Sequence, residues 1–154
     1  MKVEDCMKRN VTFITADTTV AEAARLLVER HIGTLPVVEP GGRVIGLLTL
    51  QSLLLSVMPD FVQLVEDLDF VEDFGAAEKI RPDPALLARP VGAAMLAAVS
   101  VEQTSGLIRA FALLRQHQLH DLPVVDRQGR LVGIVSRVDI GAAFLSDWNV
   151  TQGG

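Results

Sequence analysis

The spacing of apolar and polar positions predicts an amphipathic helix near the start of the chain. Thr19 is followed three residues later by Glu22, which is the signature of a capping box at a helix start. Apolar residues then recur with helical spacing, at Val20, Ala23, Ala24 and Leu27. We expect this helix to end near Gly33, because glycine readily adopts the left-handed conformation that closes many helices.

A second helix of the same kind is predicted over residues 105–118. Its apolar face consists of Leu107, Ala110, Phe111 and Leu114. The capping signal is weaker here, because Gly106 at the helix start has no side chain to bind the backbone. Short segments rich in β-formers, residues 11–15 and 99–101, precede the two helices and are expected to be strands.

Each helix is followed by two short apolar runs that are typical of paired strands. "LPVVE" and "LPVVD" each lead, through a turn that contains glycine, to a second run, at residues 44–48 and 131–135. Thr49 or Ser136 then stands at the expected start of a final helix. The predicted order of elements is therefore β-α-β-β-α, and it occurs twice.

The sequence itself repeats along with these elements. Residues 35–52 align without gaps on residues 122–139, at a constant offset of 87, and seven of the 18 positions are identical. Met7 and Met95 also correspond, with a slip of one residue. One copy of about 55 residues buries too little apolar surface to be stable alone. We therefore predict an α/β (α+β) fold in which two repeats pack through their sheets as a pseudo-two-fold pair.

The repeats are expected at residues 1–58 and 90–150, with a linker at residues 59–89 between them. The linker has apolar residues at helical spacing from Phe61 to Val71 and acidic residues on the opposite face, which predicts an amphipathic helix. Pro82 and Pro84 end the pattern. Two interpretations remain open: a linker helix with a solvated acidic face, or a docking helix for a partner or a second subunit.

Composition and charge narrow the possible functions. The net charge of −5 argues against general binding of nucleic acid, which requires a concentrated basic surface, but it leaves room for one anion in a local pocket. Cys6 is the only cysteine, and we expect it to be an inert packed residue. The most apolar stretch, residues 44–58, is shorter than the roughly 18–20 residues of a membrane span. With no secretory signal in the first residues, we expect a cytoplasmic protein without a membrane segment.

The start of the last predicted helix carries the strongest candidate chemistry. Ser136 and Asp139 are three residues apart, so they can form a capping box. A helix start that follows a glycine can also bind an anion or a sugar, and a carboxylate can accept two hydrogen bonds from a ribose diol. In the first repeat Thr49 is present, but Ser52 stands where Asp139 stands in the second. Two interpretations of Ser136 and Asp139 remain open, a helix cap alone or a cap that also binds a sugar, and Ser52 lacks the carboxylate that a ribose site in the first repeat would use.

The segments "HIGTLPVVE…GRVIGLLT" and "LHDLPVVD…GRLVGIVSRVD" resemble the paired CBS domains of a Bateman module. The resemblance covers residues 1–58 and 90–147, and it is specific because both copies keep the turn glycine and the G-h-h-[ST] element in the correct order. It implies a stand-alone tandem CBS protein of the bacterial type. It also implies an adenosine ligand held by the element Gly133, Ser136 and Asp139, with the carboxylate on the ribose.

The resemblance extends this set of candidate ligand-binding residues. Thr49 and Gln51 are expected to serve a site across the pseudo-two-fold axis, and His120 to face phosphate, unless it is a loop residue without a role. The other implied contacts, each with an alternative as plain core or solvated residue, are Leu119 and Ile134 beside adenine, Val99 at the edge of the pocket, and Arg137 near phosphate.

We identify no enzyme motif in the sequence and no metal site. His31, His117 and His120 lack the paired spacing of metal ligands. The leading hypothesis is a regulatory module that binds an adenine nucleotide (AMP, ADP or ATP, or a related adenosyl ligand) as a ligand and not as a cofactor. It would act on an unknown effector protein and form a homodimer through its apolar helices. The alternative is a ligand-free module for dimerisation and protein interaction.

Overall fold

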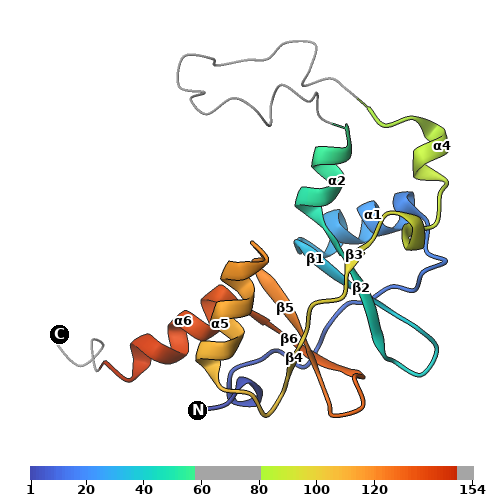
Figure 1. The fold of residues 1–154 in the computed structure, drawn as a ribbon. Helices are drawn as coiled ribbons and strands as arrows, with labels where there is room; N and C mark the ends of the chain where they lie inside the picture. Colours follow the sequence, from blue (N-terminus) through green and yellow to red (C-terminus); the bar gives the residue numbers. More distant parts are fainter. Residues whose placement is uncertain (58–80, 149–154) are drawn as a thin grey trace, which may run out of the picture.

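The structure, a computed structural model, describes residues 1–57 and 81–148 (Figure 1). The first repeat contains the short helix η1 (Val3–Asp5), helix α1 (Val20–Arg30), strands β1 (Thr34–Val38) and β2 (Val44–Thr49), and helix α2 (Leu50–Val57). The remaining elements are α4 (Pro84–Leu87), η3 (Val91–Ala93), β3 (Leu96–Ala97), β4 (Val101–Glu102), α5 (Leu107–Gln116), β5 (Asp121–Val125), β6 (Leu131–Ser136) and α6 (Arg137–Ser146). The predicted linker helix, with apolar residues from Phe61 to Val71, lies outside the described residues.

The strands form two sheets of three, in the orders β1-β2-β3 and β4-β5-β6. The hairpin β1/β2 pairs Thr34 with Thr49, and the hairpin β5/β6 pairs Asp121 with Ser136. Both hairpins have an irregularity at the equivalent position, near Val38 and Val125. The register of the two hairpins is thus the same at the offset of 87 seen in the sequence, and the predicted α/β pair of repeats is confirmed.

Each repeat is completed by residues from the start of the other. Strand β3 follows the linker but pairs with β2, and Lys8 pairs with Ile134 of β6. The backbone N–H of Val3 donates to the carbonyl of Ser105, and that of Val91 donates to the carbonyl of Thr18. Figure 1 accordingly shows the blue N-terminal end of the chain beside α5 of the second repeat. This exchange fixes the two repeats against each other.

The exchange explains the glycine that precedes each final helix. A Cβ added at Gly46 would lie 2.5 Å from the Sδ of Met95, and one at Gly133 would lie 2.8 Å from the Sδ of Met7. Both methionines arrive on the exchanged segments. The glycines are therefore needed because the exchanged methionines pack directly on the strand backbone.

Two hydrophobic cores lie under the sheets, one in each repeat. Val3 packs into the core of the second repeat and Val91 into that of the first, so the exchange also joins the cores. Cys6 packs against the second core, and burial raises the pKa of its thiol, as do the negative charges of Asp139 and Asp5. This environment agrees with the expectation of an unreactive cysteine.

Some predicted boundaries were wrong. Helix α1 ends at Arg30, and the left-handed residue is His31 (φ 53°) rather than Gly33. Its backbone N–H still reaches the carbonyls of Leu27 and Val28, and these bonds offset the cost of a left-handed conformation in a residue with a Cβ. Residues 11–15 form only an isolated parallel bridge, between Ile14 and Val37 at the free edge of β1.

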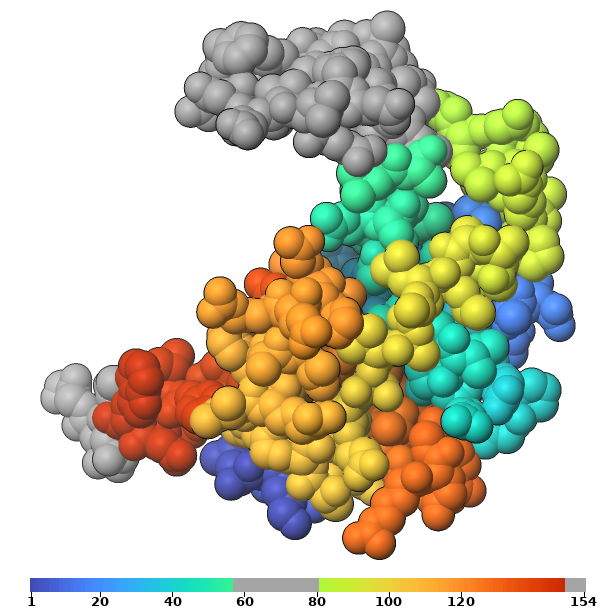
Figure 2. All heavy atoms as spheres, in the orientation of Figure 1, coloured from blue at the N-terminus to red at the C-terminus, as the bar shows by residue number. Residues whose placement is uncertain are grey.

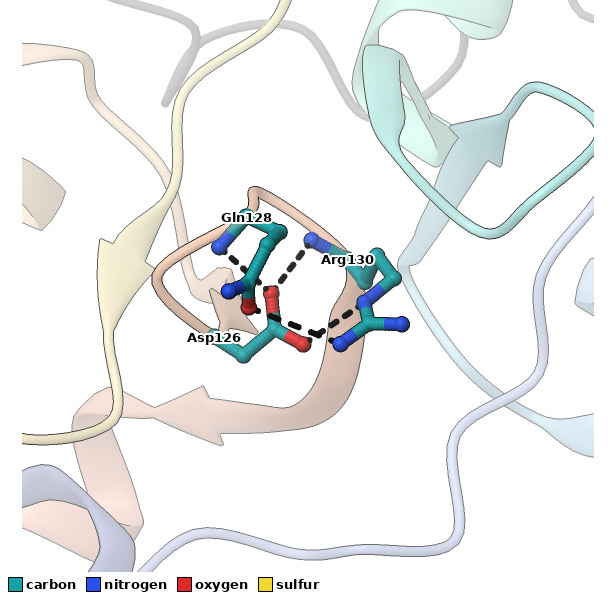
Figure 3. A network of polar contacts seen from close by, with 3 residues as sticks. All are labelled: Asp126, Gln128 and Arg130. Atoms are coloured by element: carbon teal, nitrogen blue, oxygen red, sulfur yellow. Dashed lines mark hydrogen bonds and ion pairs between the residues drawn. The ribbon is translucent and has the colours of Figure 1, made fainter.

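The turn between β5 and β6 is closed by a polar network (Figure 3). One carboxylate oxygen of Asp126 accepts the backbone N–H groups of Gln128 and Arg130, and the other accepts the Nε–H of Arg130, all at 2.9 Å. The bonds from Arg130 and Gln128 lower the pKa of Asp126.

Among residues 1–57 and 81–148, no helix has the length and apolarity needed to cross a membrane.

Candidate ligand site at the repeat interface

The capping box at the start of α6 is formed. The side-chain oxygen of Ser136 accepts the backbone N–H of Asp139 at 3.0 Å, and Oδ2 of Asp139 accepts the backbone N–H of Ser136 at 2.9 Å. These two bonds satisfy donors at the helix start that would otherwise lack partners. The prediction that Ser136 and Asp139 form a capping box is therefore confirmed.

The first repeat closes the same cap without an acid. The side-chain oxygen of Thr49 accepts the backbone N–H of Ser52 at 3.0 Å, and the hydroxyl of Ser52 accepts the backbone N–H of Thr49 at 3.3 Å. The Ser52 hydroxyl also donates to the carbonyl of Thr49 at 2.8 Å. A serine at this position is thus a sufficient cap, so capping alone does not account for the carboxylate of Asp139.

The carboxylate of Asp139 has a second oxygen, which the cap does not use. This atom, Oδ1, lies 3.7 Å from Nζ of Lys8. The side chain of Asp139 is only 15% exposed, whereas that of Lys8 is 66% exposed. Lys8 reaches this position through the exchanged segment that pairs with β6. The helix start therefore presents a carboxylate and an ammonium group side by side, at the junction of the repeats.

A cavity of about 420 Å³, which we call the first cavity, lies against the start of α2. It is lined by residues 49–52, 54 and 55 from the end of β2 and from α2, and by residues 117–120 from the turn after α5. Gly33, Thr34 and Leu96 complete the wall. In the space-filling view the orange end of α5 lies against the green surface of α2 (Figure 2).

A smaller cavity of about 290 Å³, the second cavity, lies on the Lys8 side of the junction. Its wall consists of Lys8, Asp121, Ile134 and residues 10–12 and 31–34. Several of these positions match the first cavity by the repeat: Lys8 corresponds to Leu96, and Asp121 to Thr34. The pseudo-two-fold axis thus relates part of the two walls, although no residue of α6 lines the second cavity, and the two cavities differ in charge.

Thr34 and Asp121, which are equivalent residues of the two repeats, meet between the cavities. The Thr34 hydroxyl donates to Oδ2 of Asp121 at 3.3 Å. Burial raises the pKa of Asp121, and the hydrogen bond from Thr34 and the positive charges of His120 and Lys8 partly oppose this rise. The charge of Asp139 adds to it. Asp121, Asp139 and Lys8 thus belong to one electrostatic cluster beside the second cavity.

The structure divides the predicted site residues between several places. Thr49, Leu119 and His120 line the first cavity together with Gln51 and Ser52. Ile134 lines the second cavity, and Ser136 and Asp139 stand at the start of α6. Gly133 packs against Met7, and Val99 packs against the second core. Arg137 binds the carbonyl of Leu119 through its Nε–H at 2.9 Å. The predicted residues therefore do not line one common pocket.

Sequence reasoning missed Lys8, Thr34, Asp121 and His117. The match of Met7 to Met95 was the signal that residues near position 8 belong to the repeat, but it does not reveal which repeat they contact. Asp121 follows His120 directly and precedes the repeated pattern "LPVV", yet its contact with Thr34 cannot be read from the sequence. These residues meet because of the exchange and the pseudo-two-fold axis.

The chain is similar to several known proteins. It is 30% identical over 140 residues to a CBS domain-containing protein of Dictyostelium discoideum, which covers 90% of this chain and 87% of that protein. It is 29% identical to CBS domain-containing protein YhcV of Bacillus subtilis (strain 168), over 94% of this chain and 86% of that protein. The match to a homoserine O-acetyltransferase of Methanocorpusculum labreanum is 26% identical over 88% of this chain, but it spans only 23% of that enzyme.

Solved structures have the same fold. CBSX2 in complex with AMP has a TM-score of 0.71 and 27% identity, and the match covers 96% of this chain and 98% of that one. CBSX2 from Arabidopsis thaliana has a TM-score of 0.73 and 25% identity, with 96% of each chain covered. The profile of the CBS domain family matches residues 3–58 and 91–146. The chain therefore belongs to the CBS domain family and carries a pair of CBS domains.

Proposed function

We propose that this protein is a regulatory module that binds an adenosyl ligand in the second cavity, beside Asp139. The observation that carries the proposal is the second carboxylate oxygen of Asp139. A serine is enough for the cap, as Ser52 demonstrates, so the acid has a use beyond it. The complex of the similar CBSX2 with AMP, and that of the CBS domain pair of protein MJ0100 with 5-methylthioadenosine and S-adenosyl-L-methionine, support this class of ligand.

Each residue of the proposed site has a chemical role. Asp139 accepts hydrogen bonds from the ribose hydroxyls through Oδ1, and Oδ2 keeps its bond to the backbone of Ser136. Lys8 is the cation nearest to this carboxylate and supplies positive charge for a phosphate, while Ile134 offers an apolar contact for adenine. A bound phosphate would draw Lys8 away from Asp139. Binding would then be coupled to the exchanged segment that carries Lys8.

Isothermal titration calorimetry with AMP, ADP, ATP and S-adenosylmethionine tests the proposal. We expect one site per chain for at least one of these ligands. Lys8→Met should lower the affinity for ligands that carry phosphate more than the affinity for S-adenosylmethionine, because only the phosphate ligands use the ammonium group. No detectable heat with any of the four ligands at millimolar concentration would contradict the proposal.

A second candidate is a module for dimerisation and protein interaction without a ligand. Large apolar side chains are exposed on two helices: Leu50, Leu54 and Leu55 on α2, and Val138, Phe144 and Leu145 on α6. Surfaces of this kind favour association. We propose a homodimer, and a non-catalytic action through an effector protein. Light scattering that gives the mass of a monomer at micromolar concentration would count against the dimer.

A further inference from the structure

The first cavity differs from the second in the charge of its wall. No acidic side chain lines the first cavity within the described residues, and the position of Asp139 is taken by Ser52. The hydroxyl of Ser52 already accepts a hydrogen bond from the backbone N–H of Thr49 and donates one to the carbonyl of Thr49. The described wall of the first cavity therefore lacks a carboxylate, which could accept hydrogen bonds from both hydroxyls of a ribose.

The start of α2, which lines the first cavity, is also more apolar than the equivalent start of α6. Leu50 stands at the position of Arg137, and Leu54 and Leu55 stand at the positions of Gly141 and Ala142. These leucines are partly exposed and present a continuous apolar surface to the cavity. Leu96 also lines the first cavity, and Lys8 stands at the equivalent position in the second. A ligand of this cavity must have an apolar body.

Several polar side chains that line the first cavity favour an anion. His117 and His120 line it, and imidazole can donate a hydrogen bond to an anion or carry a positive charge. The guanidinium of Arg137 binds the carbonyl of Leu119 and so lies behind the same wall. The hydroxyl of Thr49 accepts the N–H of Ser52 and retains its own proton to donate. His117, His120 and Thr49 therefore give this cavity hydrogen-bond donors beside its leucines.

We propose that the first cavity is a separate binding site for a small amphipathic anion, with an apolar body and one carboxylate or phosphate head. The body lies on the leucines of α2, and the head faces His117, His120 and Thr49. An adenosyl ligand is excluded because the acid that would bind its ribose is absent. This proposal does not depend on the adenosyl site, since the two sites share only Gly33 and Thr34 as lining residues.

Fluorescence titration with 8-anilinonaphthalene-1-sulfonate, an aromatic sulfonate, gives the first measurement. The expected result is a fluorescence increase that octanoate or octyl phosphate reverses, and that octylamine and AMP do not reverse. The two anions distinguish a carboxylate head from a phosphate head. Calorimetry with octanoate provides a readout that does not depend on the dye. Equal displacement by AMP, or no binding of either the dye or octanoate, would overturn the proposal.

A matched pair of variants locates the site. Leu54 is 44% exposed in the first cavity, and Leu145 is 46% exposed on α6, outside it. Leu54→Glu should weaken octanoate at least tenfold, while Leu145→Glu should leave its affinity unchanged. Light scattering and circular dichroism check that the two variants have the same assembly state and the same secondary structure. Equal weakening by both would show that the probe binds exposed apolar surface in general, and the proposal would fail.

The role of the head group has its own test. The double variant His117→Gln and His120→Gln should weaken octanoate at least threefold and leave the binding of neutral octanol unchanged. Asp139→Asn should change neither. If no nucleotide binds to the protein but octanoate does so with this pattern, the adenosyl proposal fails and the present one stands.

Discussion

The starts of α2 and α6 close equivalent hydrogen bonds with different residues. Thr49 and Ser52 form the cap of α2 at 3.0 and 3.3 Å, and Ser136 and Asp139 form that of α6 at 3.0 and 2.9 Å. The local structure is the same, but only the second keeps an unused carboxylate oxygen, which faces Lys8. A duplicated element can thus preserve its structural role in both copies while only one copy carries a carboxylate oxygen that the cap does not use.

The surroundings of the two helix starts have diverged in the same direction. Lys8 and Asp121 bring charge to the second cavity, whereas Leu96 and Thr34 occupy the equivalent positions in the first. The chemical difference is therefore spread over several positions and is not confined to the acid. We expect the two sites to differ in ligand class as well as in affinity.

The largest effect is expected at the glycines that the exchanged segments contact. In Gly133→Ala the new Cβ would lie 2.7 Å from the backbone oxygen of Lys8, which cannot move without displacing the segment. In Gly46→Ala the closest atom, at 2.5 Å, is the Sδ of Met95, whose flexible side chain can turn away. We expect Gly133→Ala to cost about 2–3 kcal/mol of unfolding free energy and Gly46→Ala about 1 kcal/mol less.

Denaturant unfolding of the two glycine variants measures this difference. Ala97 and Ala98 are exposed on the surface, so Ala98→Ser serves as a control that should change stability by less than about 0.5 kcal/mol. Equal costs for the two glycine variants would mean that the exchanged backbone is as free to move at Lys8 as the side chain of Met95 is.

The next effect separates the cap of α6 from its carboxylate. Asp139→Asn keeps one acceptor oxygen for the backbone of Ser136, so it should cost less than about 1 kcal/mol of stability. It removes the charge that would bind ribose, so nucleotide affinity should fall about tenfold or more, since a charged hydrogen bond contributes roughly 1.5–3 kcal/mol. Calorimetry and denaturant unfolding measure the two quantities separately.

The matched control for Asp139→Asn is Ser52→Ala in the other repeat. It removes a cap of the same kind and should cost about 1 kcal/mol of stability, but it should leave nucleotide affinity unchanged. An unchanged nucleotide affinity in Asp139→Asn, beside measurable binding in the parent protein, would refute the assignment of ribose to this carboxylate.

A third change asks whether the acid is all that the first repeat lacks. Ser52→Asp restores the carboxylate, but Leu96 still stands where the second cavity has Lys8. We expect the number of nucleotide sites per chain to remain one, and the double variant Ser52→Asp with Leu96→Lys to gain a second site at least tenfold weaker. A second nucleotide site in the single variant, measured by calorimetric stoichiometry, would show that the first cavity fails to bind nucleotide only because the acid is missing.

The smallest effect concerns the pH dependence of stability. Burial raises the pKa of Asp121 above its unfolded value of about 3.9. A raised pKa in the folded state means that the contribution of Asp121 to stability is full below pH 4 and is lost as the pH rises through the folded pKa. The unfolding free energy of the parent minus that of Asp121→Asn should therefore decrease from pH 3.5 to pH 6.

Urea unfolding of both proteins across this pH range provides the measurement. Thr34→Val removes the hydrogen bond that partly lowers the pKa of Asp121, so it should shift the decrease to higher pH. A difference that grows with pH would indicate that the carboxylate of Asp121 is better stabilised in the folded state than in the unfolded state.

Much of the fold could be predicted from the sequence because the same local patterns occur in both repeats. The helical stripe after Thr19, the paired strands and the G-h-h-[ST] element each depend on neighbouring residues, and the constant offset of 87 confirmed that they form one repeated unit. The cap of α6 was predictable for the same reason, since Ser136 and Asp139 are three residues apart. The end of α1 was not, because any residue with compensating bonds can adopt the left-handed conformation, and His31 does so here.

Only the tertiary structure decided which residues share a cavity. Lys8 and Asp139 are 131 positions apart, and they meet because the N-terminal segment pairs with β6 of the other repeat. The resemblance to CBS domains grouped Leu119 and His120 with Asp139 in one site, yet they line the first cavity. The exchange of segments accounts for Lys8, and the packing of the repeats against each other accounts for Leu119 and His120. Sequence patterns record local periodicity and carry no information on either.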